Sequence, residues 1–314
     1  MNTFGIIMGQ IELFVVLILV GILAVKTKIL NQEALGYFSK YLMRIAIPVM
    51  IFTNTIHGAT RAELLSSIPV LLVAAVMFVG LSLLAWVMSG LLKLQGNERQ
   101  IYRAASTFGN IGFMGIPLVA ALFPETGMLY IALFTIVDQS TLWTLGMSLT
   151  QPAGAKKEKL SVPALLKKMI NPAMVGILLS ILFVLLDISL PEVVDKALTS
   201  IAGTSSPLSM IYIGGLFCYT NLAKYLKKKE FYIMTVTKMV LFPVVFYLIL
   251  KQLPISREII ITITVLSALP EMSTIPMFAD ANGSDGEYAI GALMVTTMLS
   301  ILTLPLIGYL VQVL

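Results

Sequence analysis

Ten apolar runs, most of them close to 20 residues long, follow one another along this 314-residue sequence. A helix needs about 20 mainly apolar residues to cross the hydrocarbon core of a bilayer. The chain is 58% hydrophobic and only 12% charged, whereas a soluble domain carries roughly 25% charged residues. We therefore predict an all-α integral membrane protein, with the segment 191–202 too polar to span and expected at the membrane interface. The ten predicted transmembrane helices are 5–25, 35–56, 64–92, 101–122, 128–149, 168–187, 203–223, 231–251, 257–279 and 287–312.

The lysines and arginines predict the orientation of these helices. Most of the 21 basic residues fall in alternate connections, at residues 26–40, 93–103, 156–168 and 224–229. Because cytoplasmic loops carry an excess of Lys and Arg, we expect these connections in the cytoplasm and both termini on the extracellular or periplasmic side. The net charge of +5 then reflects topology in a plasma or inner membrane. We expect a multi-pass protein that contacts the lipid bilayer and binds no nucleic acid.

The two halves of the chain resemble one another. Three residues of the first half meet their counterparts at a single offset of 159 residues: Pro48 and Pro207, Pro117 and Pro276, Gly127 and Gly286. One such coincidence arises by chance in an apolar chain, but three, with the span boundaries in step, favour a repeat. Each half holds five spans, an odd number, so the repeats must be inverted relative to one another. We expect one transporter unit at 1–314, made of repeat one at 5–149, a cytoplasmic linker at 150–167 and repeat two at 168–314.

Glycine and proline interrupt the fourth and ninth predicted spans at equivalent places. The residues concerned are Gly109, Gly112, Gly115 and Pro117 in the fourth span, and Pro270 and Pro276 in the ninth. A helix in lipid must satisfy its own backbone, and such residues break the hydrogen-bond ladder. Glycine also lets membrane helices pack closely, but breaks at matching places in two halves are typical of a transporter binding site. We therefore predict that helices 4 and 9 are broken and cross one another.

Unwound backbone in mid-membrane offers two kinds of ligand. The N-terminal end of a half-helix presents free N–H groups and partial positive charge, which suits a carboxylate. The carbonyl groups freed at the other half-helix suit a cation. We expect the substrate at Asn110, Gly112, Gly115, Pro117, Ser273, Thr274 and Pro276, and the coupling ion near Ser106 and Pro270.

Ionisable side chains within membrane spans are candidates for function because burying them costs free energy. Glu271 lies inside the ninth-span break, where it could share a Na⁺ with carbonyl groups, carry a proton, or bond to backbone freed by Pro270. Asp138 lies in the fifth span and could bind an ion or pair with Arg44 or Lys238. Arg44 could extend to the cytoplasmic surface or attract an anionic substrate.

The sequence carries no pattern typical of an enzyme. It contains no nucleophile elbow, no phosphate-binding loop and no zinc-protease motif. His57 is the single histidine and Cys218 the single cysteine, which excludes a Cys₂His₂ metal site and a disulfide within the chain. We expect no cofactor other than a coupling Na⁺ or H⁺, and transport driven by a gradient rather than by nucleotide.

Several segments resemble the auxin efflux carrier family. They are GNIGFMGIPL at 109–118, INPAMVG at 170–176, AIPV at 46–49 and the ninth-span segment 267–285. The long central loop of the plant carriers is absent, so the chain is similar to short prokaryotic members such as malate or malonate permeases. The resemblance implies two inverted five-helix repeats, an arrangement shared with bile acid–sodium symporters, and an elevator-like movement in a homodimer. It places Asn110, Pro117 and Pro276 at a carboxylate site, whereas Glu271 departs from the small or uncharged residue expected there.

The sequence therefore favours a secondary active transporter of a small organic anion, coupled to Na⁺ or H⁺. A bile-acid-type sodium symporter and an uncoupled exporter of another solute are the alternatives within transport. A channel would show a continuous polar stripe along several helices, and a membrane sensor would normally carry a signalling extension. Neither feature is evident in the sequence.

Overall fold

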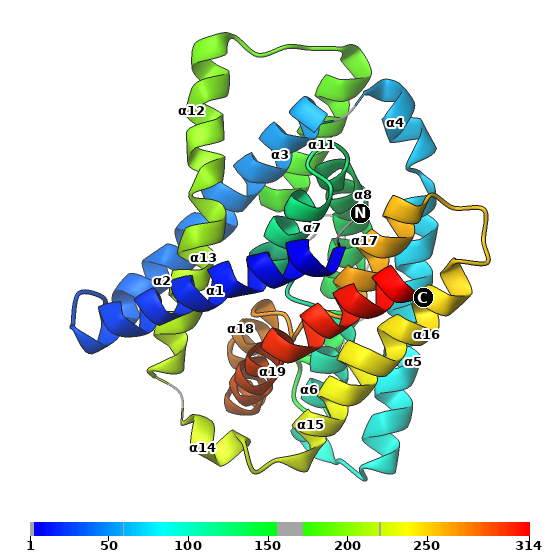
Figure 1. The fold of residues 1–314 in the computed structure, drawn as a ribbon. Helices are drawn as coiled ribbons and strands as arrows, with labels where there is room; N and C mark the ends of the chain where they lie inside the picture. The colour runs from blue at the N-terminus through cyan, green and yellow to red at the C-terminus, as the bar shows by residue number, and fades with distance from the viewer. Residues whose placement is uncertain (1–2, 59, 156–171, 220) are drawn as a thin grey trace.

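The computed structural model describes residues 3–58, 60–155, 172–219 and 221–314, and the described residues form helices and no β-strand (Figure 1). The helices of the first half, coloured blue to green, are α1 (Thr3–Lys26), α2 (Gln32–Tyr41), η1 (Leu42–Ala46), α3 (Ile47–Gly58), α4 (Arg61–Ser66), α5 (Pro69–Leu91), α6 (Gly96–Thr107), η2 (Ile111–Gly115), α7 (Ile116–Leu122), α8 (Gly127–Thr141), η3 (Leu142–Gly146) and α9 (Met147–Leu149). Those of the second half, coloured green to red, are α11 (Pro172–Leu186), α12 (Glu192–Gly203), α13 (Ser205–Phe217), α14 (Leu222–Tyr225), α15 (Lys229–Val236), η4 (Thr237–Leu241), α16 (Phe242–Leu250), α17 (Arg257–Ser267), α18 (Thr274–Ala281) and α19 (Gly286–Val313).

The predicted spans coincide with helical segments. Six stretches are long and apolar enough to cross a membrane unaided: Thr3–Lys26, Gln32–His57, Arg61–Leu91, Gly127–Leu149, Lys229–Leu250 and Gly286–Val313. Ile111–Leu122 and Pro172–Leu186 are shorter apolar helices. An all-helical, multi-pass architecture is therefore confirmed for the described part of the chain. The number ten and the inverted repeat stay predictions, and most of the linker predicted at 150–167 lies outside the described residues.

The polar segment before the seventh predicted span is helical, and its expected place at the membrane interface stays a prediction. Residues 191–202, expected at the interface, largely form α12, which leads into α13 in nearly the same direction (Figure 1). α12 packs along α3, and Nε2 of His57 lies 2.7 Å from Oδ1 of Asp195. The polar side chains of α12 are thus accommodated on its solvent-facing and α3-facing sides, so polarity does not end the helix.

Widened helical turns precede three of the prolines. The π-helical turns η1, η2 and η4 end two residues before Pro48, Pro117 and Pro243, respectively. Proline has no N–H group and its ring clashes with the carbonyl four residues earlier, and a π-turn relieves that clash by adding a residue to the turn. The residue before each proline accordingly donates its N–H to a carbonyl five residues back, as Ile116 does to Ile111. The helical hydrogen bonds at these turns therefore continue up to each of the three prolines.

Both termini lie side by side, and α1 forms the contact (Figure 1). The backbone N of Phe4 donates to Oε1 of Gln312 at 3.2 Å. On its other side α1 touches α13 so closely that a Cβ on Gly21 would lie 2.1 Å from the carbonyl oxygen of Ile211. A Cβ on Gly214 would lie equally close to the carbonyl oxygen of Ile18. Glycine is required at this contact because any side chain would overlap backbone of the facing helix.

The outer face of α5 is apolar and exposed. Leu72, Val79, Leu83 and Trp86 recur at helical spacing along it and are all exposed. A stripe of this kind would promote aggregation in water, whereas lipid chains solvate it without cost. The exposed surface therefore agrees with a membrane environment.

Candidate functional site: a cavity at two broken helices

The fourth and ninth spans are both interrupted, and they meet backbone to backbone at the interruptions. α6 ends at Thr107 and helical structure resumes at Ile111, while α17 ends at Ser267 and α18 begins at Thr274. Gly109 and Glu271 form an isolated antiparallel bridge. The amide of Asn110 donates to the Pro270 carbonyl at 2.9 Å, and the amide of Met272 donates to the Phe108 carbonyl at 3.2 Å. Both predicted breaks are present, and we call their meeting point the crossing.

The unwound stretch of the fourth span is shorter than the glycine pattern predicts. Only residues 108–110 leave the helix, because Gly112 and Gly115 lie within the π-turn η2. Gly115 instead allows close packing, since a Cβ there would lie 2.8 Å from Cδ1 of Leu269. Gly109 also packs against the ninth span, where a Cβ would lie 3.1 Å from Cβ of Leu269. The glycines thus serve mainly to bring the two broken helices together.

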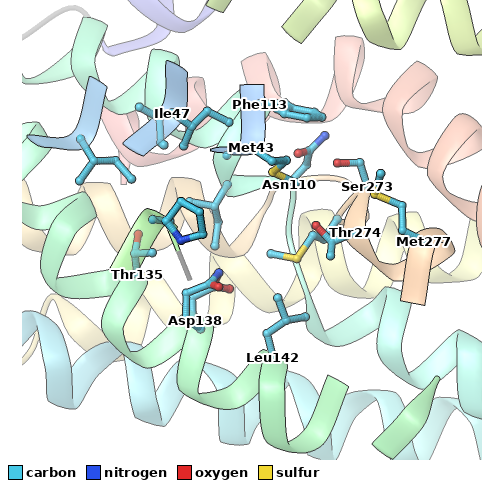
Figure 2. A pocket seen from close by; sticks show the side chains of 18 of the residues that line it. Met43, Ile47, Asn110, Phe113, Thr135, Asp138, Leu142, Ser273, Thr274 and Met277 are labelled. Carbon is cyan, nitrogen blue, oxygen red and sulfur yellow. The ribbon is translucent and has the colours of Figure 1, made fainter. Parts of the chain in front are cut away.

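A cavity of about 400 Å³ lies beside the crossing (Figure 2). Its wall combines η1 and α3 of the second span, η2, α8 of the fifth span, and the start of α18. Most of the lining is apolar, with Met43, Ile47, Phe113, Leu142 and Met277 among the contributors (Figure 2). Small-molecule sites of about 300–1,000 Å³ with a few polar groups on an apolar wall are typical of ligand-binding proteins.

The polar groups beside the crossing are hydrogen-bond donors. Asn110 is 2% exposed and lines the cavity, and its amide Nδ2 is buried without a hydrogen-bond partner among the described residues. Ser273 and Thr274 lie close by at the N-terminal end of α18 (Figure 2). Ile111 and Gly112, at the N-terminal end of the other half-helix, line the same cavity. Two helix N-termini and an unpartnered amide therefore face one space, which suits an anion.

Asp138 lines the cavity opposite these donors (Figure 2). It is 1% exposed, and Nε2 of Gln139 donates to its Oδ2 at 3.0 Å while Oδ1 has no partner. Among the described residues it forms no ion pair with Arg44 or Lys238, the two partners considered from the sequence. Those two cations are directed elsewhere: Arg44 lies exposed on the cavity wall and Lys238 lies at the crossing.

The residues predicted for the site divide into two groups. Arg44, Asn110, Gly112, Asp138, Ser273 and Thr274 line the cavity. The remaining members of the prediction are not part of its wall: Gly115, Pro117, Pro276, Ser106, Pro270 and Glu271. The three prolines shape the backbone rather than face the cavity, because each lies in a break or in the first turn after one. Glu271 and Ser106 are buried behind the crossing, and their side-chain oxygens lack hydrogen-bond partners.

Lys238 lies at the crossing, a position that the sequence analysis does not predict for it. It lies in η4, is 1% exposed, and its Nζ donates to the carbonyls of Ala105 at 2.7 Å and Phe108 at 2.9 Å. Both carbonyls belong to the C-terminal end of α6, where the helix has no further N–H groups to satisfy them. Its position within a span makes it a candidate for function. The sequence alone does not decide whether its partner is Asp138 or a backbone carbonyl.

A membrane-embedded helical chain with a polar cavity at two helix breaks has the construction of a secondary transporter. Residues 6–308 match the family model described as membrane transport protein, and the chain belongs to this family, that of the auxin efflux carriers. It is 24% identical to a protein of Rhizobium meliloti named "Putative malonate transporter", over 98% of this chain and 96% of that protein. It is also 25% identical to an uncharacterized transporter of Methanocaldococcus jannaschii, over 66% of this chain and 68% of that protein. The chain is a membrane transporter and not an enzyme.

Proposed function

We propose that this protein is a secondary transporter of a small dicarboxylate or a related organic anion, which binds in the cavity beside the crossing. The observation that carries the proposal is the buried, unpartnered Nδ2 of Asn110, placed between two helix N-termini. A carboxylate oxygen would satisfy that donor and lie close to the positive ends of the half-helices that begin at η2 and α18. Arg44 adds positive charge at the same cavity. The name of the Rhizobium meliloti relative makes malonate the first substrate to test.

A coupling ion accompanies the anion in this proposal. Asp138 lies on the cavity wall, with Gln139 as its hydrogen-bond donor. An anion and an ionised Asp138 would repel one another in a space of this size, because charges interact strongly away from water. A proton or a Na⁺ bound at Asp138 removes that repulsion, and one bound at Glu271 removes negative charge behind the crossing. Either would link the ion gradient to transport. The cavity would reach either side of the membrane by an elevator-like movement, in a homodimer with both termini outside.

Thermal unfolding of the purified protein in detergent tests the substrate class. Malonate, malate and succinate are compared with malonamide, a neutral compound of similar size, because a ligand of the folded state stabilises it by RT ln(1 + [L]/Kd), about 2.7 kcal/mol at 100 times Kd. We expect one or more dicarboxylates to raise the melting temperature and malonamide to leave it unchanged. Stabilisation by malonamide alone, or by no carboxylate, would overturn the proposed substrate class.

Uptake into proteoliposomes separates the competing functions. A carrier gives saturable uptake that depends on a H⁺ or Na⁺ gradient, whereas a channel gives flux that rises with concentration without saturating. Uptake of a bile acid in place of malonate, dependent on Na⁺, would favour the sodium symporter alternative. Saturable exchange without either gradient would favour an uncoupled exporter.

A further inference from the structure

The crossing presents carbonyl groups on the side away from the cavity, and the side-chain ammonium group of Lys238 binds them. Broken membrane helices commonly use carbonyls of this kind to bind a coupling Na⁺. Here the ammonium group of Lys238 makes two hydrogen bonds, to Ala105 and Phe108, at distances of 2.7 and 2.9 Å. The Phe108 carbonyl also accepts the amide of Met272, so Lys238 joins three segments: η4, the end of α6 and the ninth-span break.

Glu271 is the carboxyl group that interacts with this ammonium group. It is fully buried and interacts electrostatically with Lys238, but the two side chains form no direct ion pair. Its backbone N–H donates to Oγ1 of Thr296 at 3.1 Å, but both of its carboxylate oxygens lack a hydrogen-bond donor. An ionised carboxylate without donors is poorly stabilised inside a protein, whereas the carboxylic acid tolerates such surroundings. Glu271 can therefore exchange between the two forms, while Lys238 is held as a cation by two carbonyl dipoles.

The other charged and titratable groups around the pair are accounted for. α5 and α16 pack against η4 and carry no Asp, Glu, Lys or Arg. Tyr288 of α19 interacts electrostatically with Glu271. It interacts also with Tyr102, which is buried, and with Glu98 and Glu230, which are partly exposed.

Two of these outer groups and a nearby arginine already have partners. Lys228 lies 2.6 Å from Glu98 and 3.4 Å from Glu230, so the outer carboxylates are compensated. Arg103 of α6 turns away from the crossing and donates to Ser89 at 2.8 Å. Lys238 and Glu271 thus form the charged pair closest to the cavity on this side.

We propose that Lys238 is the built-in cation of the crossing and that Glu271 is its proton-binding partner, so that the ion coupled at this pair is a proton and not sodium. The inference rests on the proposed transport of an organic anion. Before the anion binds, Lys238 and Glu271 compensate one another. When a carboxylate arrives at Asn110, one proton from solvent binds a carboxylate oxygen of Glu271, and Lys238 becomes the counter-ion of the substrate. The proton leaves Glu271 when the anion leaves.

Linkage makes this mechanism measurable. If the anion raises the affinity for the proton, the proton must raise the affinity for the anion by the same factor. Titration calorimetry of the wild type with malonate, in buffers of different ionisation enthalpy, should report uptake of about one proton per malonate bound. The dissociation constant should rise with pH, by at most about tenfold per pH unit for one coupled proton. It should not change when NaCl is replaced by choline chloride.

Two variants and a matched control decide the assignment. Glu271→Gln should bind malonate without proton uptake and without the pH dependence. Lys238→Ala should lose proton uptake and gain a requirement for Na⁺, since the carbonyls of Ala105 and Phe108 then face Glu271 without an ammonium group. Lys224→Ala removes a lysine from the exposed Lys224–Glu287 pair and should behave as wild type. Na⁺-dependent binding in the wild type, or full proton uptake by Glu271→Gln, would overturn the inference.

A measurement without substrate keeps this inference separate from the proposed function. Melting temperatures of the ligand-free wild type and Lys238→Ala are compared in NaCl and choline chloride at equal ionic strength. We expect NaCl to stabilise Lys238→Ala specifically and to leave the wild type unchanged. Failure of malonate to bind at all would overturn the proposed substrate, and this comparison would still decide the role of Lys238. Equal behaviour of the two proteins would show that Lys238 does not occupy a cation position.

Discussion

The two sides of the crossing use the same backbone interruption in opposite ways. On the cavity side, beside the N-terminal ends of η2 and α18, the side-chain Nδ2 of Asn110 is a donor that no described group of the protein satisfies. On the far side, the C-terminal carbonyls of α6 are satisfied by Lys238, and no described cavity wall reaches Glu271. An interrupted helix exposes donors and acceptors in equal measure. In this protein the Asn110 donor stays available to a ligand, whereas the carbonyl acceptors are bound by the Lys238 side chain.

The far side should contribute most to stability. Replacing Lys238 with methionine removes one donor from the Phe108 carbonyl, which keeps the Met272 amide. It also leaves the Ala105 carbonyl and the Glu271 carboxylate without the ammonium group. Leaving an uncompensated charge in the interior costs about 3–5 kcal/mol. We expect a large fall in the melting temperature of Lys238→Met in detergent. Adding Glu271→Gln should recover part of the loss, because the remaining charge is then removed. If the two changes were instead additive, Lys238 and Glu271 would not act as a pair.

The cavity side should affect binding rather than stability. Asn110→Ala removes a hydrogen bond to a charged ligand, which contributes about 1.5–3 kcal/mol, so malonate affinity should fall by roughly 10- to 100-fold. Asn110→Asp should abolish binding by repulsion. Calorimetry measures both effects, and Asn97→Ala, which alters a surface contact to Ala153, is the control. An unchanged affinity in Asn110→Ala would remove Asn110 from the binding site.

Close packing joins the two sides, and Gly115 tests it. A Cβ at this position would lie 2.8 Å from Leu269 and 3.0 Å from Leu266, and overpacking of this kind costs about 1–3 kcal/mol. Gly115→Ala should therefore lower the melting temperature and weaken malonate binding together. Gly90 of α5 has open space around it, and Gly90→Ala should leave both unchanged or slightly stabilise the helix. Independent changes in stability and binding would show that the crossing does not couple them.

Arg44 should contribute less to binding than Asn110, because it is exposed. Ion pairs at exposed sites contribute up to about 1 kcal/mol and are screened by salt. Arg44→Gln should weaken malonate binding by about fivefold or less at low ionic strength. The difference from wild type should vanish in high salt. A salt-independent loss of binding would place Arg44 in direct, water-excluded contact with the anion.

The smallest effect is expected from the exposed counterpart of the buried pair. The hydrogen bond between Lys224 and Glu287, 2.9 Å long, raises the pKa of Lys224. A raised lysine pKa contributes stability that is present below its ordinary value and is lost as the pH rises through the raised value. Because both side chains are exposed, Glu287→Gln should leave the neutral-pH melting temperature unchanged and remove only a small alkaline-side dependence. A fall in melting temperature as large as that of Lys238→Met would show that burial does not explain why the two pairs differ in their contribution to stability.

The apolar runs, and the prolines and glycines that interrupt them, made the spans and both breaks predictable. A bilayer demands helices of a minimum length, and proline lacks a backbone N–H, so Pro270 and Pro276 with polar residues between them favour an interruption of the ninth span. Gly115 shows where this reasoning stops. Glycine permits an unwound backbone and close packing equally well, and only the neighbouring Leu269 identifies its role as packing. The helix α12 is a related case, because its packing against α3 and the contact of Asp195 with His57 are not evident from its own sequence.

The sequence by itself determined that this chain is a helical membrane transporter with interruptions in its fourth and ninth spans. Those properties depend on the length and hydropathy of each apolar run and on the missing N–H group of proline, all of which are local features of the sequence. Only the tertiary structure decided that Asp138 and Arg44 share the cavity with Asn110, and that Lys238 meets the carbonyls of α6 beside Glu271. The partner of a buried charge depends on how each helix is rotated about its axis. That rotation is set by contacts between segments more than a hundred residues apart, such as Ala105 and Lys238.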